Sequence, residues 1–342
     1  LLLAGSVHSH PSAATSNPFA GSGRYARPFG RLSVEVFDKT SDDLLYEYPL
    51  PASHGVGNYY DQVSSVMMNL AKVQNTGAEF VLNATPVQSG DFSWDLAFNF
   101  SASKDKILDL AGDDDIVMSD TKKIWKVGES QYEFYMPTWK GVDAANGDPL
   151  WKKGEGVTNS YGQADYDLQG RATPWGYGSL SNTLSWKGLS LSFMFYYNLG
   201  GKFYDALYAN MMHEGNNSGK NINVDEMNAW TPSNTVTDVP KFINSNDNLS
   251  NSPSTRFLYD ATYLKLKNVN LSYSLPKSLL RNVGIISAAR VYVNADNLFT
   301  VFADKRYKGY DDIDIFGIGG YDAYPNYIPL SRTYTMGVNI TF

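Results

Sequence analysis

Strict alternation of apolar and polar side chains is the feature that most constrains the fold of this chain. In the segment DFSWDLAFNFSAS, one face carries only large apolar side chains: Phe92, Trp94, Leu96, Phe98 and Phe100. Small or polar residues occupy the other face, and a period of two residues is typical of a β-strand. The closing segment RTYTMGVNITF alternates in the same way and ends on Phe342. The chain is therefore expected to consist mainly of β-strands.

The pattern recurs along the whole chain. We expect eight such strands, at about residues 31–48, 76–86, 91–104, 178–187, 189–199, 260–274, 286–300 and 331–342. Between the fourth and fifth, Lys187 and Gly188 predict a tight turn and hence a hairpin. In the sixth, the apolar phase slips between Leu266 and Val269, which predicts a β-bulge near Lys267 and Asn268.

Short and long connections alternate along the chain. The short ones are at about 87–90, 187–188 and 275–285, and the long ones at about 51–75, 105–177, 200–259 and 301–330. In an up-and-down sheet, this order places every short turn at one end and every long loop at the other. Outer-membrane barrels have short periplasmic turns and long extracellular loops. The alternation of short and long connections also requires an even number of sheet strands, none or two, within 105–177. Segments 132–140 and 149–153 in this range are expected to form a hairpin.

The strand length fits a membrane. Eleven residues at about 3.3 Å each, tilted by about 45°, span roughly 25 Å, the height of the apolar band of such a barrel. The apolar face would then contact lipid, and the polar face would line a wet interior. A soluble antiparallel sandwich shows the same alternation. The sorting of the loops and the aromatic end of the chain favour the barrel.

Composition excludes several other classes of protein. The net charge of −7 argues against a nucleic-acid partner. The absence of cysteine excludes disulfides and thiol chemistry. His8 with His10, and the carboxylates at 113–115 and 311–314, lack a complete set of metal ligands. We therefore expect no catalytic residue, no metal site and no cofactor.

Several motifs together resemble the SusC/RagA-like branch of the TonB-dependent outer-membrane transporters. They are KVQNTGAEFVLNATPVQSGDFSWDLAFNFSASKDKILDL, YMPTWKGVDAANGDPLW, STRFLYDATYLKLKNVNLSYSLPKSLL, RVYVNADNLFTVF, YKGYD and the closing RTYTMGVNITF. The resemblance runs from about Arg31 to Phe342. Residues 1–30 match nothing and are expected to be irregular or disordered.

The resemblance implies a barrel of about 22 strands in the outer membrane of a Gram-negative cell. It further implies an N-terminal plug, a TonB box, a SusD-like surface lipoprotein acting as a lid, and TonB-driven import of glycans or peptides. Family members are much longer than this chain, so 31–342 is interpreted as the C-terminal portion of the barrel, without plug or TonB box. Two open sheet edges in a bilayer would be costly, which agrees with an incomplete barrel. The alternatives are a small self-contained outer-membrane barrel and a soluble carbohydrate-binding β-sandwich.

Aromatic residues supply the candidate sites. Sugars stack on exposed aromatic faces, so the loop tryptophans are candidate ligand contacts: Trp139, Trp151, Trp175 and Trp230. Packing between loops, or against a lid, is the other interpretation. Tyr and Trp near strand ends are expected at the membrane interface. Phe342, the last residue, resembles the signal recognised by the barrel assembly machinery, and alternatively is only the last membrane-facing residue.

Overall fold

A computed structural model describes residues 7–11, 30–49, 65–110, 114–118, 121–217, 219–281, 284–307 and 331–342. The regular secondary structure within these ranges is almost entirely antiparallel β-strand, with a few short helices. None of the helices there is both long and apolar enough to cross a membrane.

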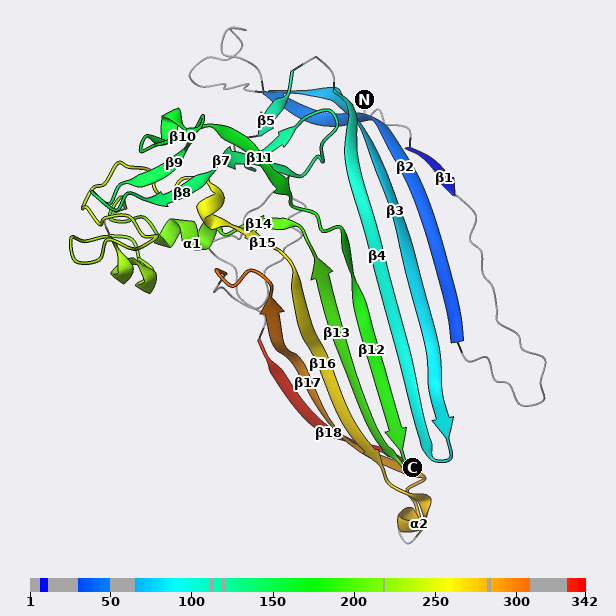
Figure 1. Cartoon of the computed structure of the whole chain (residues 1–342). Helices are drawn as coiled ribbons and strands as arrows, with labels where there is room; N and C mark the ends of the chain where they lie inside the picture. Colours follow the sequence, from blue (N-terminus) through cyan, green and yellow to red (C-terminus); the bar gives the residue numbers. More distant parts are fainter. Residues whose placement is uncertain are drawn as a thin grey trace.

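One nine-stranded antiparallel sheet forms the body of the molecule (Figure 1). Its strands, in spatial order, are β1 (Val7–Pro11), β2 (Gly30–Pro49), β3 (Ser65–Ser89), β4 (Phe92–Leu110), β12 (Gly176–Trp186), β13 (Leu189–Leu199), β16 (Tyr263–Ser274), β17 (Ala288–Phe302) and β18 (Thr333–Thr341). Eight of them are the predicted strands, each beside the next along the chain. β4 pairs directly with β12, so the described part of the intervening loop adds no strand to this sheet.

The ninth strand lies in the segment expected to be irregular or disordered. β1 pairs with residues Phe37 to Ser41 of β2. The rest of 1–30, apart from Gly30, lies outside the described residues. Among the described residues β1 and β18 each have a single neighbour, so the sheet remains open.

The register of the strand pairs places the alternating apolar side chains on one face of the sheet. Directly paired residues form an apolar row across seven strands: Leu32, Leu82, Phe98, Leu180, Phe195, Leu266 and Phe299. The adjacent row faces the other way and is mostly polar: Arg31, Asn83, Ala97, Ser181, Met194, Asn268, Asp296 and Thr333. A slip of one residue would exchange the two faces, so the register is strongly specified.

The predicted bulge in β16 is confirmed. Phe195 pairs with Leu266 and Met194 with Asn268, which leaves Lys267 without a partner in the ladder. The ladder between β16 and β17 is interrupted at the same level. There, Asn297 of β17 has a left-handed φ of 54°. The extra residues keep Leu266 and Val269 on the same face despite the slip in the sequence.

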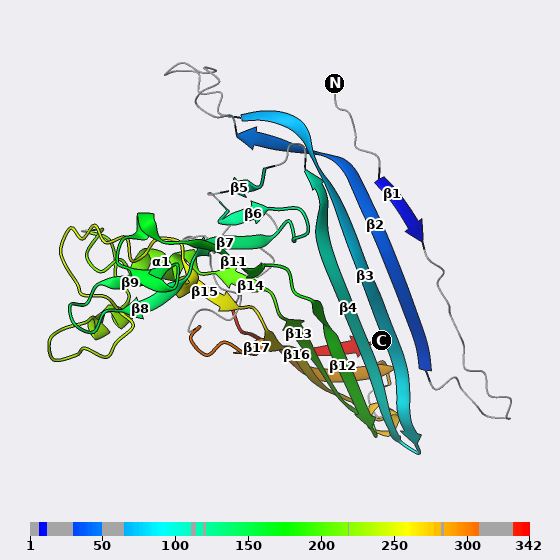
Figure 2. The same cartoon turned by 45° about the horizontal axis from the view of Figure 1, so that its top comes forward.

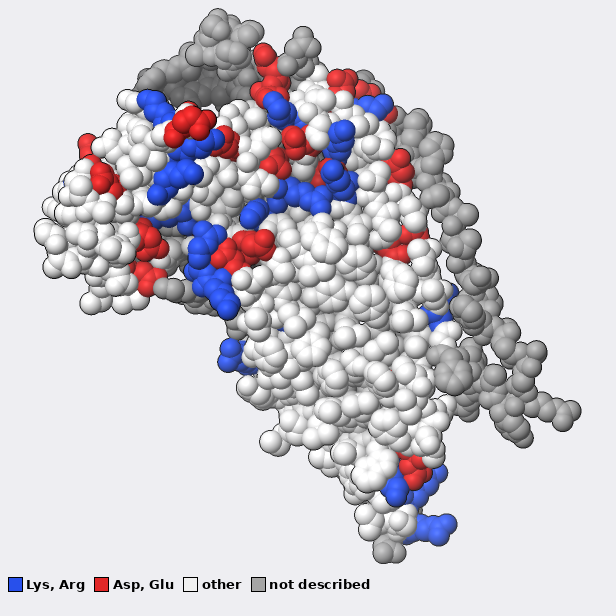
Figure 3. Space-filling model, viewed as in Figure 1, with Lys and Arg blue, Asp and Glu red and all other residues white. Residues whose placement is uncertain are grey.

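Loop length is sorted by side, as predicted. The β3–β4 turn, the β12–β13 turn at Lys187 and Gly188, and the connection carrying α2 (Lys277–Leu280) lie at one end of the sheet (Figure 1). The two long loops that the structure describes, between β4 and β12 and between β13 and β16, lie at the opposite end. The face seen in Figure 3 carries its charged residues at these two ends, and the surface between them is nearly uncharged.

Two strands are longer than the alternation predicts. β3 begins at Ser65 and β4 continues to Leu110, so β2, β3 and β4 extend beyond the shorter strands β12 and β13 (Figure 2). The extension is stabilised by a buried cluster that includes Val73 and Ile107 of the sheet and Trp125 of the following loop. The sheet therefore projects beyond the height of the apolar band.

The long loops form small sheets of their own. One contains β11 (Tyr166–Arg171), β7 (Glu133–Pro137), β6 (Lys123–Trp125) and β5 (Ile116–Met118); another β10 (Gly156–Thr158), β9 (Pro149–Lys153) and β8 (Trp139–Val142); and a third β14 (Lys202–Tyr204) and β15 (Leu258–Asp260). The short helical elements are α1 (Ala206–Met211) and the 3-10 turns η2 (Tyr161–Gln163), η3 (Val224–Asn228) and η4 (Thr255–Phe257).

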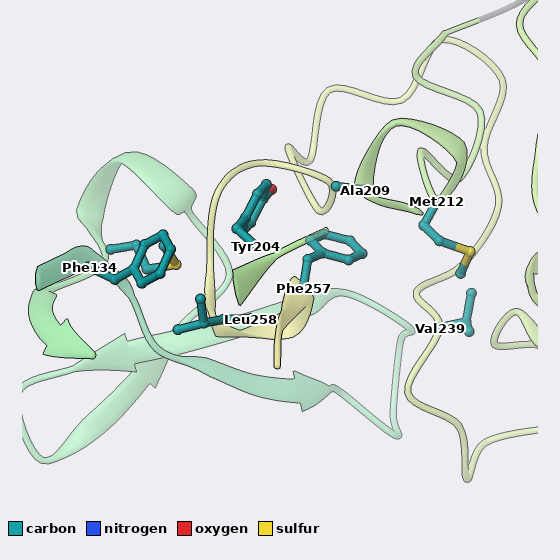
Figure 4. Close-up of a cluster of buried hydrophobic side chains, with 8 residues drawn as sticks. Phe134, Tyr204, Ala209, Met212, Val239, Phe257 and Leu258 are labelled. Atoms are coloured by element: carbon teal, nitrogen blue, oxygen red, sulfur yellow. The ribbon is translucent and has the colours of Figure 1, made fainter. Parts of the chain in front are cut away.

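The hairpin expected at 132–140 and 149–153 is only partly correct. β8 pairs with β9, but β7 pairs instead with β6 and β11. Phe134 and Met136 of β7 pack with residues of the next long loop, among them Tyr204, Met212 and Phe257 (Figure 4). This packing draws β7 away from the β8–β9 pair.

Candidate functional site

Aromatic side chains mark both ends of the apolar face. At the loop end, Trp175 packs edge-on against Phe100, with ring centroids 6.1 Å apart, and Tyr197 stacks on Phe98 at 6.3 Å. At the turn end, Trp186 is exposed and the Nζ of Lys187 lies 5.5 Å from its ring centroid. The eleven residues of β12 between these ends span roughly 25 Å when tilted. This spacing is the one that two aromatic girdles around an apolar band require.

Trp175 lies at the loop end of the apolar face, where a girdle residue is expected. Its side chain is 54 % exposed, and it stands at the edge of the apolar face, just before β12. A membrane-interface residue fits this place better than a ligand contact within the loops.

Trp139 and Trp151 lie together, but other side chains cover their rings. Trp151 is fully buried, with the rings of Trp139 and Tyr161 at 5.7 and 5.4 Å. The guanidinium of Arg256 lies 5.0 Å from the centroid of Trp139. In this conformation Trp151 has no face available for a sugar, so its placement supports the packing interpretation.

Trp230 joins two loops. Its Nε1 donates a hydrogen bond to the carbonyl of Ala144 at 3.0 Å. A Cβ at Gly147, whose φ is 78°, would lie 2.7 Å from the indole, so the ring packs closely on that turn. Trp230 remains half-buried. The four tryptophans thus do not form one surface: among the ring contacts of the described residues, only Trp139 and Trp151 meet.

The sequence did not point to a buried ionic network in the loop between β13 and β16. The Nη2 of Arg256 donates to Glu214 Oε1 at 2.6 Å, and Ser250 donates to the other carboxylate oxygen. The backbone N–H of Glu214 donates to Glu226 Oε1 at 2.9 Å. Burial raises the pKa of the Glu226 carboxyl above its ordinary value. No spacing rule predicts such a network, because its four members come from four separate turns and short helices.

The polar face carries amide and carboxylate groups that hydrogen-bond to one another. The Nδ2 of Asn268 donates to Asn294 at 2.8 Å and to Asp296 at 2.6 Å. Arg290 donates to the Ser272 hydroxyl at 2.6 Å. Much of the rest of this face on β12 and β13 is Ser or Thr, with Ser181, Thr183 and Ser192 as examples. Such a wall offers neutral hydrogen-bonding groups to water or to a polar cargo.

The described residues contain no grouping of three or more His, Asp or Glu side chains placed to hold a metal ion. The carboxylates at 311–314 and Asp113 lie outside the described part of the chain, as do the side chains of His8 and His10.

Phe342 directly follows β18, and its side chain is 80 % exposed. It continues the alternation that places Tyr334, Met336, Val338 and Ile340 on the apolar face. Its role as an assembly signal stays a prediction.

These features define a class: an all-β, barrel-like sheet with one apolar face, one polar face, and packed loops at one end. Comparison with known proteins gives the family. The chain is 30 % identical to TonB-dependent receptor P3 of Formosa agariphila, over 91 % of this chain and 32 % of the relative. It is 25 % identical to TonB-dependent receptor SusC of Bacteroides thetaiotaomicron, over 92 % of this chain and 30 % of the relative.

Solved structures agree. The structure of the RagAB peptide transporter superposes with a TM-score of 0.77 and 26 % identity, covering 98 % of this chain and 40 % of that one. The "open-open" state of the RagAB peptide importer gives 0.73 and 27 %, over 97 % and 38 %. No family model matches the chain.

The resemblance to SusC/RagA-like TonB-dependent transporters is thus confirmed over most of the chain. The relatives are named receptors and transporters, not enzymes. The chain spans about a third of the length of these curated relatives.

Proposed function

We propose that this chain is the C-terminal portion of the barrel of a TonB-dependent outer-membrane importer of glycans or peptides. The observation that carries the proposal is the apolar row across seven paired strands, in a sheet that superposes on the RagAB peptide transporter. The open sheet supports a piece of a larger barrel, because unpaired edges in hydrocarbon leave backbone groups unsatisfied.

A SusD-like surface lipoprotein is the proposed lid. The loop between β13 and β16 exposes large apolar side chains at Val224, Met227 and Val236, with Met227 85 % and Val236 92 % exposed. We infer that these side chains contact the partner, because apolar groups exposed to this degree lose water contact when an interface forms. We call these three residues the docking surface.

Photo-cross-linking tests the partner. A benzophenone amino acid is placed at Met227, or at Val157 on the other long loop as a comparison, in the protein in its native outer membrane. We expect position 227 to capture a lipid-anchored protein, identified by mass spectrometry, and Val236→Asp to reduce the yield several-fold. Capture at 227 that is unaffected by Val236→Asp, or no lipoprotein in the product, would contradict the docking surface.

Membrane fractionation tests the alternatives. We expect the chain in the outer-membrane fraction, and an expressed 31–342 piece that does not form a heat-modifiable folded band by itself. A compact folded band from the piece alone would favour the small self-contained barrel. Recovery in the soluble fraction would favour the carbohydrate-binding sandwich.

A further inference from the structure

Arg256 occupies the junction between the two longest described loops. One loop connects β4 to β12 and the other connects β13 to β16. The guanidinium lies 5.0 Å from the ring centroid of Trp139 in the first loop and 4.9 Å from that of Phe257 in the second. A planar guanidinium can stack on aromatic rings and still donate hydrogen bonds in its own plane.

The in-plane hydrogen bonds of Arg256 are also formed. Nη2 donates to the Glu214 carboxylate at 2.6 Å, and Nη1 donates to the Ser250 carbonyl at 3.1 Å. Glu214 is fully buried and the Arg256 side chain nearly so. Removing one partner of a buried ion pair leaves the other charge uncompensated, so this contact tolerates little rearrangement.

Other contacts beside Arg256 join the same two loops. The N–H of Trp139 donates to Thr255 Oγ1 at 2.9 Å, and the Tyr161 hydroxyl donates to the Pro253 carbonyl at 2.8 Å. Further along, Lys241 forms an ion pair with Asp148 at 2.8 Å. A buried cluster that includes Phe134 of the first loop and Phe257 of the second also joins them. Arg256 differs from these contacts in that it stacks on the first loop while it hydrogen-bonds to Glu214, 42 positions away in the second.

We propose that Arg256 is the positioning residue that makes the two long loops one rigid body over the end of the barrel. As a consequence, the docking surface on the second loop is held at a fixed place relative to β8 and β9 of the first. This inference deepens the proposed function, since a lid partner needs a preformed surface. Its test uses neither cargo nor partner, so a failure of the importer proposal leaves the measurement valid.

Distance measurement between spin labels tests the inference in the protein in its native outer membrane. The chain contains no cysteine, so labels introduced at Val157 and Val236 are the only ones it carries. Both side chains are exposed and lie on different loops. A second pair, Val224 and Val236, lies within one loop and reports on that loop alone.

We expect one narrow distance distribution for the Val157–Val236 pair, and at least a doubling of its width in Arg256→Gln. Arg256→Lys is expected to give an intermediate width, since a lysine keeps the charge but loses the fork and the stacking. The Val224–Val236 width is expected to stay unchanged. An Arg256→Gln distribution between the loops that is as narrow as that of the unaltered protein would overturn the proposal.

Two further variants keep the test decisive. Trp139→Leu removes the stacking surface on the first loop without leaving a buried charge, and the same broadening is expected. Arg306→Gln is the control for loss of an arginine that does not join the loops: Arg306 also pairs with a carboxylate, Asp304 at 2.6 Å, and lies 5.2 Å from the Tyr259 ring centroid, but its side chain is 61 % exposed. Broadening by Arg306→Gln equal to that by Arg256→Gln would show a general loosening and overturn the specific role of Arg256.

Discussion

The indole Nε1 of Trp94 donates a hydrogen bond to the Oδ1 of Asn182, 3.0 Å away on the neighbouring strand. Both residues lie on the apolar face, where Asn182 pairs with Leu96 and Trp94 with Leu184. An amide in hydrocarbon is costly unless it is hydrogen-bonded. The tryptophan thus satisfies the polar side chain that interrupts the apolar face.

Trp94→Phe should destabilise the barrel by about 1–3 kcal/mol, because it leaves the Asn182 carbonyl without its donor. Adding Asn182→Leu should restore most of this loss, since no polar group is then left unsatisfied. The free energy of unfolding by guanidinium in lipid vesicles measures both variants. A double variant no more stable than Trp94→Phe alone would show that the bond has no such role.

Deletion of Lys267 should be tolerated far better than deletion of a residue from a regular strand. Lys267 has no ladder partner, and without it Leu266 and Val269 still share a face, because the alternation then runs without a slip. Deletion of Ser192 from β13, by contrast, moves Phe193 and the residues after it to the opposite face. We expect loss of the heat-modifiable folded band in outer membranes for the Ser192 deletion and a folded band for the Lys267 deletion. Loss of the band in both deletions would contradict the bulge.

The stability of the loops should depend on pH through Glu226. Burial raises its folded-state pKa above the ordinary 4.5, so the folded state binds the proton more tightly than the unfolded state. Its contribution is fully present below pH 4.5 and is lost as the pH rises through the raised value. Burial raises the pKa of Glu133 and Asp205 as well, so the comparison requires a single variant.

Glu226→Gln should therefore stabilise the loops relative to the unaltered protein at pH 8, and less so as the pH falls toward 4.5. The loop melting temperature, followed by near-ultraviolet circular dichroism of the buried tryptophans, measures this difference. A difference that does not change with pH would exclude the proton linkage.

The sheet could be predicted from the sequence because lipid and water impose a period of two. The order of the strands, the tight turn at Lys187 and the bulge at Lys267 all follow from that period and from loop lengths. The extension of β3 back to Ser65 does not, because Val73 packs on a loop residue, Trp125, instead of on lipid. There, tertiary packing replaces the membrane as the partner of the apolar side chains.

The loops could be predicted much less well. Trp151 is a residue type that can contact a sugar, but it is buried like a core residue. Its burial depends on Trp139 and Tyr161, which no local sequence pattern places beside it. The Glu214–Arg256 pair joins residues 42 positions apart through irregular backbone. No local pattern encodes a contact of that kind.

The assignment of the apolar face to lipid and of the polar face to water is tested most directly by placing a lysine on each face of the sheet. Phe98→Lys and Phe195→Lys should each lower the free energy of unfolding from lipid vesicles by about 2–4 kcal/mol, as expected for a charge on the lipid face at mid-bilayer. Asn99→Lys, one residue away on the polar face, should change it by less than about 1 kcal/mol. Equal losses at Phe98 and Asn99 would contradict the assignment of the apolar face to lipid.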